Sequence, residues 1–335
     1  MQSQTNQQKI EQLKESIFVQ ALGVKENESI VVVADPRKEM EAQALLAAGQ
    51  LCSENIELVY VENMTQNGQE PSTEIAQKMI QADVALLVTH FSLSHTRARD
   101  AASKQGTRVA SMPGITFDML DRTSTADYET INTQSNILAE KLTKAHSFKI
   151  TGKEGTDLSG SLLNRTGLAD GGILHNTGDM GNLPAGEAFI APVEDSVNGT
   201  LVIDASLADV TLDSPITLTI SNGEITHISG QKAAKEFEKQ LNEVGNSARI
   251  IAELGIGTNP TVDAFGDVLE AEKALGTCHI AFGDNISMGG TNNAPFHSDG
   301  VVLKPTLILI DGENNTEETI IKDGLLLELK QKSQN

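Results

Sequence analysis

Short apolar runs alternate with amphipathic stretches along the first half of the chain. Residues 28–35 (ESIVVVAD) and 84–90 (VALLVTH) are rich in β-branched and aliphatic residues and have the length of buried strands. Residues 39–52 (EMEAQALLAAGQLC) carry apolar residues at helical spacing. Buried strands that alternate with helices predict a parallel sheet with helices on both faces. The same pattern predicts further helices near 8–23, 72–82, 95–105 and 127–147, and further strands at 56–62 and 107–114.

The second half has a different pattern, in which apolar and polar residues alternate at every second position. Residues 148–163, 200–212 and 215–230 show this alternation, interrupted by Gly, Asn and Asp. Ser221-Asn222-Gly223 is a strong signal for a hairpin turn. The pattern therefore predicts antiparallel strands. Later elements predicted here are helices at 232–245 and near 267–274, strands at 247–254, 278–283 and 305–312, and a hairpin at 318–329.

These two patterns predict an α/β protein with two domains. A chain of 335 residues is longer than a single hydrophobic core usually serves. We expect an N-terminal α/β domain of Rossmann-like type, with a parallel sheet, over residues 1–146. Residues 147–335 are expected to form an α+β domain with a largely antiparallel sheet, and this second domain is expected to bind metal and carry catalysis.

The charge of the chain argues against several classes of partner. It has 46 acidic and 25 basic side chains, a formal net charge of −21, so a nucleic acid would be repelled. Aromatic residues make up 3% of the chain and Trp is absent, which leaves few platforms for stacking bases. No uninterrupted run of about 18 apolar residues occurs, so we expect no membrane span. Cys52 and Cys278 form no CxxC pair, and a reducing cytoplasm fits this usage.

Five acidic or imidazole side chains with the chemistry of metal ligands lie in the second half. Glu187 follows a Pro-Ala-Gly turn, Glu253 lies near the end of the apolar segment RIIAEL, and His279 lies inside the apolar segment CHIAFG. His297 and Asp299 are two residues apart, so in an extended segment both point to one face. A buried carboxylate is costly without a partner, so Glu253 is expected to pair with a cation or a metal. Mixed carboxylates and imidazoles suit Zn, Mn, Co or Fe.

Each of these residues also has a simpler interpretation. Taken alone, His279 is a histidine satisfied within the core, and Glu187 is a carboxylate at a strand edge that faces water. Five ligands exceed what one open metal site needs. The set therefore predicts either two ions with a bridging carboxylate, or one of the five residues that contacts a ligand instead of binding the metal itself. Gly255 and Gly257, which follow Glu253, are expected to let the backbone approach its neighbours closely, with a tight bend near the metal as the reason.

Further polar residues near these segments are candidates for catalysis. Glu270 and Glu272, in the short helix before His279, are either a general base or part of a solvated helix face. Asp284 and Asn285 follow the CHIAFG segment and are candidates for positioning a substrate. The glycine-rich segments around residues 170 and 180 lack the spacing of a phosphate-binding loop and are expected to be turns.

Four segments of the second half resemble one family of enzymes. PAGEAFIAPVEDSVNGT, AELGIGTNP, LEAEKALGTCHIAFGDN, and HSD followed by PTLILIDG occur in this order within residues 160–315. They resemble the aminopeptidase T family of thermophilic-type metallopeptidases. The resemblance implies a dinuclear site, with its ligands on Glu187, Glu253, His279, His297 and Asp299. It also implies a homodimer and hydrolysis of an amide bond by metal-activated water.

A second, shorter branch of relatives implies another chemistry. The peptidases carry a catalytic tyrosine after the histidine of the GTxHIAxG motif, whereas the only tyrosines here are Tyr60 and Tyr128. Residues 90–116 (HFSLSHTRARDAASKQGTRVASMPGIT) resemble the ring-opening 2,5-dihydroxypyridine dioxygenases. That resemblance implies one Fe(II) on a site of two histidines and one carboxylate, namely His279, His297 and Asp299. In this alternative His90, His95 and Arg97 are candidates for binding a ring hydroxyl. Their simpler interpretation is a loop after the VALLVTH strand whose histidines are merely exposed.

The expected function is therefore a metal-dependent hydrolase of the leucyl or broad-specificity aminopeptidase type. It would use Zn, Co or Mn, as one or two ions, and act on a short peptide or another small molecule. The alternative is a mononuclear Fe(II) dioxygenase that opens a hydroxylated pyridine. A binding module without catalysis would show a broken ligand set, and all five ligand positions are filled.

Overall fold

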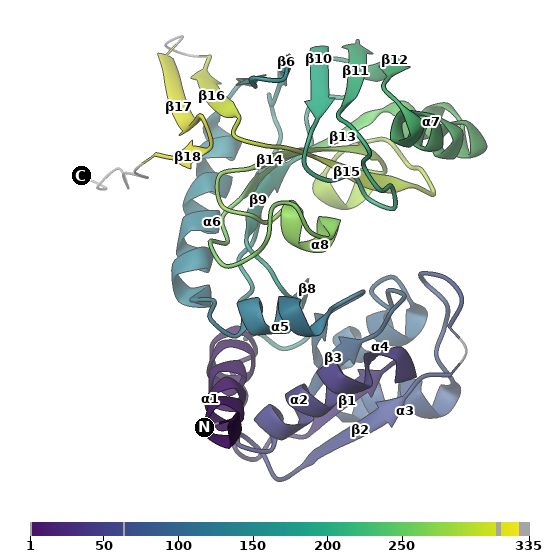
Figure 1. Cartoon of the computed structure of the whole chain (residues 1–335), viewed down its shortest axis with the longest axis vertical. Helices are drawn as coiled ribbons and strands as arrows, with labels where there is room; N and C mark the ends of the chain where they lie inside the picture. The colour runs from purple at the N-terminus through teal and green to yellow at the C-terminus, as the bar shows by residue number, and fades with distance from the viewer. Residues whose placement is uncertain (1, 63, 313–315, 328–335) are drawn as a thin grey trace. The chain divides into compact units, whose positions relative to one another are not determined.

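The computed structural model describes residues 2–62, 64–312 and 316–327 and divides into two compact units (Figure 1). Unit 1 comprises Met1–Asn132 and Gly172–Ala185, and unit 2 comprises Thr133–Gly171 and Gly186–Asn335. Relative to the predicted boundary at residue 146, this division assigns residues 133–146 to unit 2 and returns residues 172–185 to unit 1. The predicted fold class is confirmed, with a parallel sheet in unit 1 and antiparallel sheets in unit 2.

Unit 1 is built on a five-stranded sheet in the order β2-β1-β3-β4-β8, in which every pair is parallel. Three of these strands are buried along their whole length, because helices cover both faces. The strands are β1 (Ile30–Ala34), β2 (Ile56–Tyr60), β3 (Val84–Val88), β4 (Arg108–Ser111) and β8 (Met180–Asn182).

The helices of unit 1 follow the predicted alternation. Side chains cap their N-termini: Ser72 accepts from the N–H of Ile75, and Thr96 accepts from that of Arg99. One side of the sheet packs on a core shared with α3 and α4, while α2 contacts β1 and β2. The helical segments are α1 (Gln2–Leu13), the π-helix Lys14–Ala21, the 3₁₀ turn Pro36–Lys38, α2 (Glu39–Gly49), α3 (Thr73–Gln81), α4 (Arg97–Gln105), α5 (Phe117–Thr123) and α6 (Tyr128–Lys144), which continues into unit 2.

The strand β8 was expected to be a turn. The segment Gly178-Asp-Met-Gly-Asn instead contributes Met180–Asn182 to the parallel sheet, beside β4. The N–H of Val109 donates to the carbonyl of Asp179 at 2.8 Å, so pairing begins directly before this strand. A strand of three residues carries no readable periodicity, so only the tertiary contact with β4 defines β8.

Unit 2 contains a large antiparallel sheet in the order β12-β11-β10-β6-β5-β16-β17-β18. Asn222, with φ of 50°, and Gly223, with φ of 73°, form the predicted hairpin turn between β11 and β12. The predicted hairpin at 318–329 corresponds to β17 and β18, and its last two residues lie outside the described part of the chain. The strands are β5 (Ser147–Thr151), β6 (Asp157–Ser161), β10 (Asn198–Ile203), β11 (Ile216–Ser221), β12 (Glu224–Ser229), β16 (Thr306–Asp311), β17 (Thr316–Lys322) and β18 (Leu325–Leu326).

The second sheet of unit 2 has the order β15-β14-β13-β9-β7, and all its neighbours are antiparallel. Of its strands, β13 and β14 were predicted, whereas β7 and β9 were not assigned. The strands are β7 (Leu168–Asp170), β9 (Glu187–Ile190), β13 (Ile251–Gly257), β14 (Cys278–Gly283) and β15 (His297–Val302), and the accompanying helices are α7 (Lys232–Val244), α8 (Val268–Ala271) and the 3₁₀ turns Asn246–Arg249 and Ile286–Met288.

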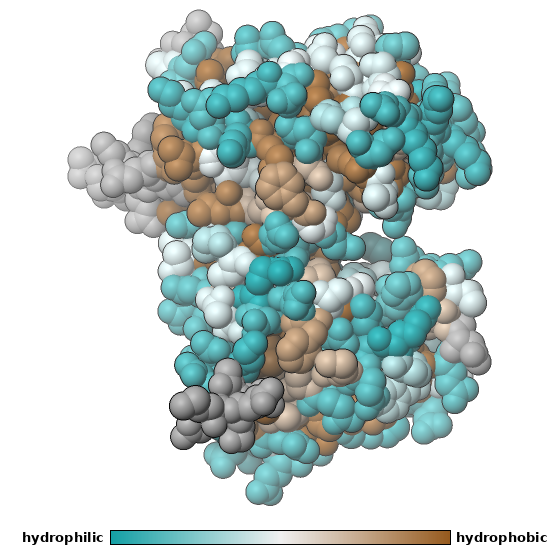
Figure 2. Space-filling view, viewed as in Figure 1, coloured by the Kyte–Doolittle hydropathy of each residue, from teal (hydrophilic) through white to brown (hydrophobic). Residues whose placement is uncertain are grey.

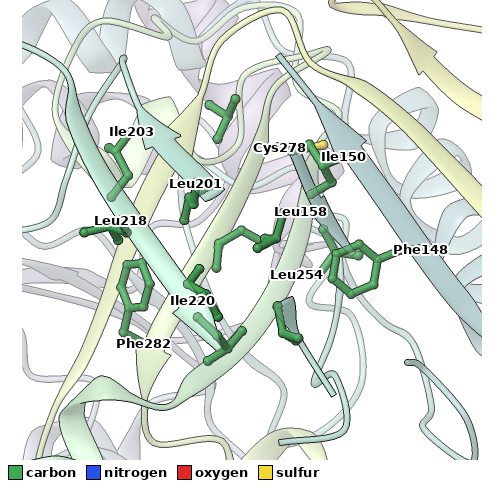
Figure 3. Close-up of a cluster of buried hydrophobic side chains, with 14 of the residues drawn as sticks. Phe148, Ile150, Leu158, Leu201, Ile203, Leu218, Ile220, Leu254, Cys278 and Phe282 are labelled. Carbon is green, nitrogen blue, oxygen red and sulfur yellow. The ribbon is translucent and has the colours of Figure 1, made fainter. Parts of the chain in front are cut away.

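One hydrophobic core joins the two sheets of unit 2 (Figure 3). Phe148 and Leu218 enter it from the large sheet, and Leu254 and Phe282 enter it from the second sheet. Helix α7 adds Phe237, whose ring lies 5.5 Å from that of Phe282. The exposed side of α7 is hydrophilic (Figure 2). The second sheet therefore uses one face for the core, which leaves its other face for polar residues.

Two smaller observations bear on the sequence predictions. Both cysteines are free, and Cys278 is buried in the core while Cys52 is partly buried. No helix among the described residues is both long enough and apolar enough to cross a bilayer.

Candidate metal centre

The five predicted ligands lie on four adjacent strands of the second sheet of unit 2. Glu187 begins β9, Glu253 is the third residue of β13 and His279 is the second residue of β14. His297 and Asp299 are the first and third residues of β15. The strand that the His-x-Asp spacing required is thus present, and it lies at the edge of the sheet, beside β14.

Strand pairing places these side chains on one face of the sheet. Asp299 is opposite Ala281, which in turn is opposite Glu253, so one row across three strands holds two carboxylates. Gly255 is opposite His279, two positions along the same strands. Because side chains alternate along a strand, residues in this row and in the second row beyond it share one face. The intervening residues, such as Leu254 and Ile280, belong to the core.

A β-bulge turns Glu253 toward this face. The register shifts between Ile251, which pairs with Phe282, and Glu253, which pairs with Ala281. Strand β13 therefore advances two residues while β14 advances one. Ile251 lies in the core together with Leu254, an odd and an even position, which strict alternation does not allow. The bulge explains why a carboxylate within the apolar segment RIIAEL is not buried in the hydrophobic core.

The expected close approach at Gly255 and Gly257 is confirmed, but the tight bend expected as its reason is wrong. Both residues lie inside β13, which continues to Gly257. A β-carbon at Gly255 would lie 1.9 Å from Nε2 of His279, and one at Gly257 would lie 2.1 Å from the carbonyl oxygen of Ala274. Gly255 is therefore needed because the imidazole of His279 lies against it, and Gly257 is needed because the backbone at Ala274 approaches it closely.

The ligand atoms of these residues meet at short distances. Nε2 of His279 lies 3.0 Å from Oε1 of Glu253 and 3.4 Å from Oε2 of Glu187. Nε2 of His297 lies 3.6 Å from Oε2 of Glu253 and 3.6 Å from Oδ1 of Asp299. Each oxygen of Glu253 thus faces a different histidine.

These contacts define two groups of possible metal ligands that share one residue. Glu187, Glu253 and His279 form one group, and Glu253, His297 and Asp299 form the other. Within each group the ligand atoms lie within 4.8 Å of one another. The arrangement suits one ion in either group, or two ions with Glu253 between them.

Backbone carbonyls hold both imidazoles in the orientation that a metal requires. Nδ1 of His279 lies 3.1 Å from the carbonyl oxygen of Glu272, and Nδ1 of His297 lies 2.9 Å from that of Asp284. A carbonyl oxygen only accepts hydrogen bonds, so each Nδ1 carries a proton and donates it. In a neutral imidazole the lone pair is then on Nε2, which faces the carboxylates.

The carboxylates and the histidines shift one another's pKa values strongly. Burial alone lowers the pKa of His279, but Glu253, Glu187 and Asp299 outweigh it and raise this pKa to about 10. The pKa of His297 is also raised to about 10, since Asp299 and Glu253 outweigh burial. Burial raises the pKa of Glu187 to about 7. Burial likewise opposes ionisation of Asp299, but the charge of His297 prevails and lowers its pKa. Without a metal, protonated histidines therefore balance the carboxylates.

The donor set fits a divalent metal ion. Two imidazole nitrogens and three carboxylates meet on one sheet face, where Glu187, Glu253 and His279 are buried. Two histidines and one carboxylate are the ligands typical of non-haem Fe(II), and the same donors accept Zn, Co or Mn. The buried negative charge is costly unless a cation compensates it.

The candidates for catalysis around the ligands have other contacts. Glu270 is buried, which excludes the solvated helix face that was one of its two interpretations. Glu272 is largely buried and is paired with Lys273. The buried side chain of Asn285 donates to Glu194 and accepts from the N–H of Asn292, so it serves the loop after β14.

Sequence reasoning missed two charged residues on this side of unit 2. Lys273 is buried, and its Nζ lies 3.5 Å from Oε1 of Glu187. Arg165 pairs with Glu194 at 2.5 Å and donates to the carbonyl oxygen of Gly289, in the loop between β14 and β15. Lys273 closes the segment EAEK of a predicted helix, a pattern typical of an exposed surface, and no neighbouring residue in the sequence indicates its burial.

The remaining candidates lie in unit 1. His90 and His95 are exposed residues of the loop after β3, and the ring of His90 packs edge-on to Phe91 at 4.8 Å. Arg97 is exposed, and its Nε lies 3.2 Å from Glu70. Their participation in binding a ring hydroxyl stays a prediction.

Comparison with known proteins bears on both branches that the sequence resembles. The family model for 2,5-dihydroxypyridine 5,6-dioxygenase matches residues 15–327. The 2,5-dihydroxypyridine 5,6-dioxygenase of Pseudomonas putida is 27% identical over 246 residues, which are 67% of this chain and 67% of that protein.

Two solved structures share the fold of the chain. The 2,5-dihydroxypyridine dioxygenase of Pseudomonas putida KT2440 has a TM-score of 0.75 and 20% identity, and the match covers 96% of this chain and 97% of that one. Wild-type AmpT from Thermus thermophilus has a TM-score of 0.69 and 16% identity, over 96% of this chain and 100% of that one. At these identities the likeness is one of fold.

The comparisons support both resemblances but weight them differently. The likeness to AmpT supports an aminopeptidase-like fold. In contrast, the matching family model describes a dioxygenase, and the related Pseudomonas putida protein is named as one. The prediction of an enzyme is therefore confirmed, and hydrolysis as its specific reaction is not. The match over residues 15–327 means that the chain belongs to the 2,5-dihydroxypyridine 5,6-dioxygenase family.

Proposed function

We propose that this protein is a non-haem Fe(II) dioxygenase that opens the ring of a dihydroxylated pyridine. The observation that carries the proposal is the pair of Nε2 atoms, from His279 and His297, that face one carboxylate, Glu253, at 3.0 and 3.6 Å. Membership of the dioxygenase family supplies the reaction class. The substrate named for the Pseudomonas putida relative, 2,5-dihydroxypyridine, is the first to test.

The proposed reaction divides its tasks between the metal and the side chains. Fe(II) held by two histidines and a carboxylate has open positions for dioxygen and for a substrate hydroxyl. Each ligand group contains one of the two histidines, and both face Glu253, so a single ion beside Glu253 would be held by His279 and His297 through Nε2. Their Nδ1 atoms are engaged with carbonyl oxygens. Glu253 and Asp299 would supply negative charge, which neutralises the cation and keeps it in the sheet face. Dioxygen is the only oxidant required, since both of its atoms enter the product.

The test is oxygen uptake by protein loaded with Fe(II) under anaerobic conditions. With 2,5-dihydroxypyridine present, we expect uptake of one O2 for each ring lost. An oxygen electrode measures the uptake, and the ultraviolet absorbance of the ring measures its loss. The variant H297A should lose most of this activity, whereas H227A, in the exposed hairpin strand β12, should retain it. Absence of uptake with dihydroxypyridine isomers and their carboxylated analogues would refute the proposal.

A second candidate function is hydrolysis of an amide bond. It is favoured by one observation, the presence of two ligand groups that share Glu253, because a bridging carboxylate suits two ions and a metal-activated water. The same apoprotein, loaded with Zn, Co or Mn, should then release amino acids from N-terminally free peptides. Hydrolysis with two bound ions and no oxygen uptake would favour this candidate over the dioxygenase.

Action on a small molecule, a homodimer and a cytoplasmic location also stay predictions.

A further inference from the structure

Lys273 is a buried ammonium group at the edge of the metal centre. Its side chain is 1% exposed, and it lies between helix α8 and strand β14. Two backbone hydrogen bonds hold its main chain in place. The N–H of Lys273 donates to the carbonyl oxygen of Glu270 at 3.0 Å, and its carbonyl oxygen accepts from the N–H of Asn259 at 2.8 Å. A buried charge needs partners, and the carboxylates of Glu187 and Glu272 provide them.

The two carboxylate oxygens of Glu187 face different partners, Lys273 and His279. Nζ of Lys273 lies 3.5 Å from Oε1 of Glu187, while Oε2 of the same carboxylate lies 3.4 Å from Nε2 of His279. The residue before the lysine also contacts this histidine, because the carbonyl oxygen of Glu272 accepts from Nδ1 of His279 at 3.1 Å. The Glu272-Lys273 dipeptide therefore touches two of the three residues in one ligand group.

From this geometry we propose that Lys273 is a positioning residue that holds Oε1 of Glu187 and so presents Oε2 to a metal bound by His279. The inference rests on the proposed metal site and adds a residue to it. Lys273 does not bind the metal, and it acts only through Glu187. Buried partners of metal ligands typically change metal affinity by about 10- to 100-fold when they are replaced.

A simple charge effect makes the opposite prediction, which allows a decisive test. If Lys273 acted only as a positive charge near a cation, its removal would strengthen metal binding, because like charges repel. If it positions Glu187, its removal weakens binding, because the freed carboxylate turns toward other partners. The sign of the change in affinity separates these two roles.

The experiment measures binding of Co(II) alone to metal-free protein by titration calorimetry and by the visible absorption of the bound ion. The variant K273M removes the charge and keeps most of the length of the unbranched side chain. We expect its Co(II) affinity to fall by about 10- to 100-fold, with a changed absorption band. The control K239M removes an exposed lysine of α7, whose side chain is 77% exposed, and should bind as the wild type does.

The outcomes are distinguishable from failure of the proposed function. If the wild type binds Co(II) and K273M binds it equally or more tightly, the role of Lys273 is refuted while the metal site stands. If the wild type binds no Co(II), both the site and the inference fail. If K273M does not fold, K273R decides, because it retains the charge and changes only geometry. Folded K273R should bind Co(II) several-fold more weakly with an altered absorption band, and wild-type affinity in K273R would refute the inference.

Discussion

The imidazole of His279 occupies the space that a side chain would fill at Gly255 on the neighbouring strand. A β-carbon at Gly255 would lie 1.9 Å from Nε2 of His279, closer than any two such atoms can approach. Gly255 is thus required by the position of the His279 imidazole, a candidate metal ligand, rather than by backbone conformation. The same face of the sheet carries Ala281 opposite Glu253, another small residue between ligands.

The first prediction follows from this contact. The variant G255A should lose most bound metal, because His279 must leave the ligand group or the two strands must separate. We expect at least about a tenfold loss of affinity, measured as metal content after dialysis against a defined concentration of the ion. The control G266A adds a methyl group that would meet its nearest atom at 3.4 Å, an ordinary contact. Full metal content in folded G255A would contradict this account of the site.

The second prediction concerns the carboxylate that both ligand groups share. The variant E253Q keeps the shape of the side chain but removes its charge and offers one acceptor oxygen where there were two. Each oxygen of Glu253 faces a different histidine, so this variant should lose metal binding whether the site takes one ion or two. We expect catalytic activity to fall by at least about 100-fold. Elemental analysis of the purified variant checks the prediction, and D195N, in the turn after β9, is a matched control.

The third prediction concerns the ion pair of Arg165 and Glu194. Arg165 donates to the carbonyl oxygen of Gly289, and Glu194 accepts from the N–H of Thr291 at 2.6 Å, so the pair holds the loop between β14 and β15 at two points. That loop supplies the carbonyl oxygen that orients His297. The variant R165M should loosen the loop and lower metal affinity by about tenfold.

Amide hydrogen exchange checks this effect directly. In R165M, exchange of the Thr291 amide should accelerate, whereas amides in β11 should be unchanged. The control R97M, at an exposed arginine of unit 1, should leave the loop protected. Unchanged exchange in the loop of R165M would show that the ion pair does not hold it.

The fourth prediction concerns the pH dependence of the metal-free protein. The pKa values of His279 and His297 are about 10 in the fold, against 6.5 for an unperturbed histidine. Their contribution to stability is therefore fully present below pH 6.5 and is lost as the pH rises to about 10. The raised pKa of Glu187, about 7, acts in the same direction from pH 4.5 upward. The melting temperature of the apoprotein should fall by several degrees between pH 6.5 and 10.

Loading with metal should remove most of this pH dependence. The ion replaces the Nε2 proton of each of the two histidines, so binding releases protons at neutral pH. Calorimetry in buffers of different ionisation enthalpy measures that release. A melting temperature of the apoprotein that stays constant or rises over this pH range would contradict the raised histidine pKa values.

Much of the fold was predictable because most elements carry a local signal. The β-branched runs of β1 and β3 and the Asn222-Gly223 turn each specify their element with little help from the rest of the chain. Strands such as β8 and β9 were missed, because three or four residues have no measurable periodicity. Their assignment depends on partners far along the chain, such as β4 for β8.

The sequence by itself determined which side chains are candidate metal ligands, and it determined the extended segment that puts His297 and Asp299 on one face, since both depend on residue type and on the two-residue repeat of a strand. Only the tertiary structure decided which face carries Glu253, because a bulge in β13 reverses the alternation there. Burial of Lys273 beside Glu187 and bracing of the loop by Arg165 were likewise decided by tertiary structure. Such contacts join segments that are distant in the chain, and the free energy of a buried charge depends on those neighbours rather than on the adjacent residues.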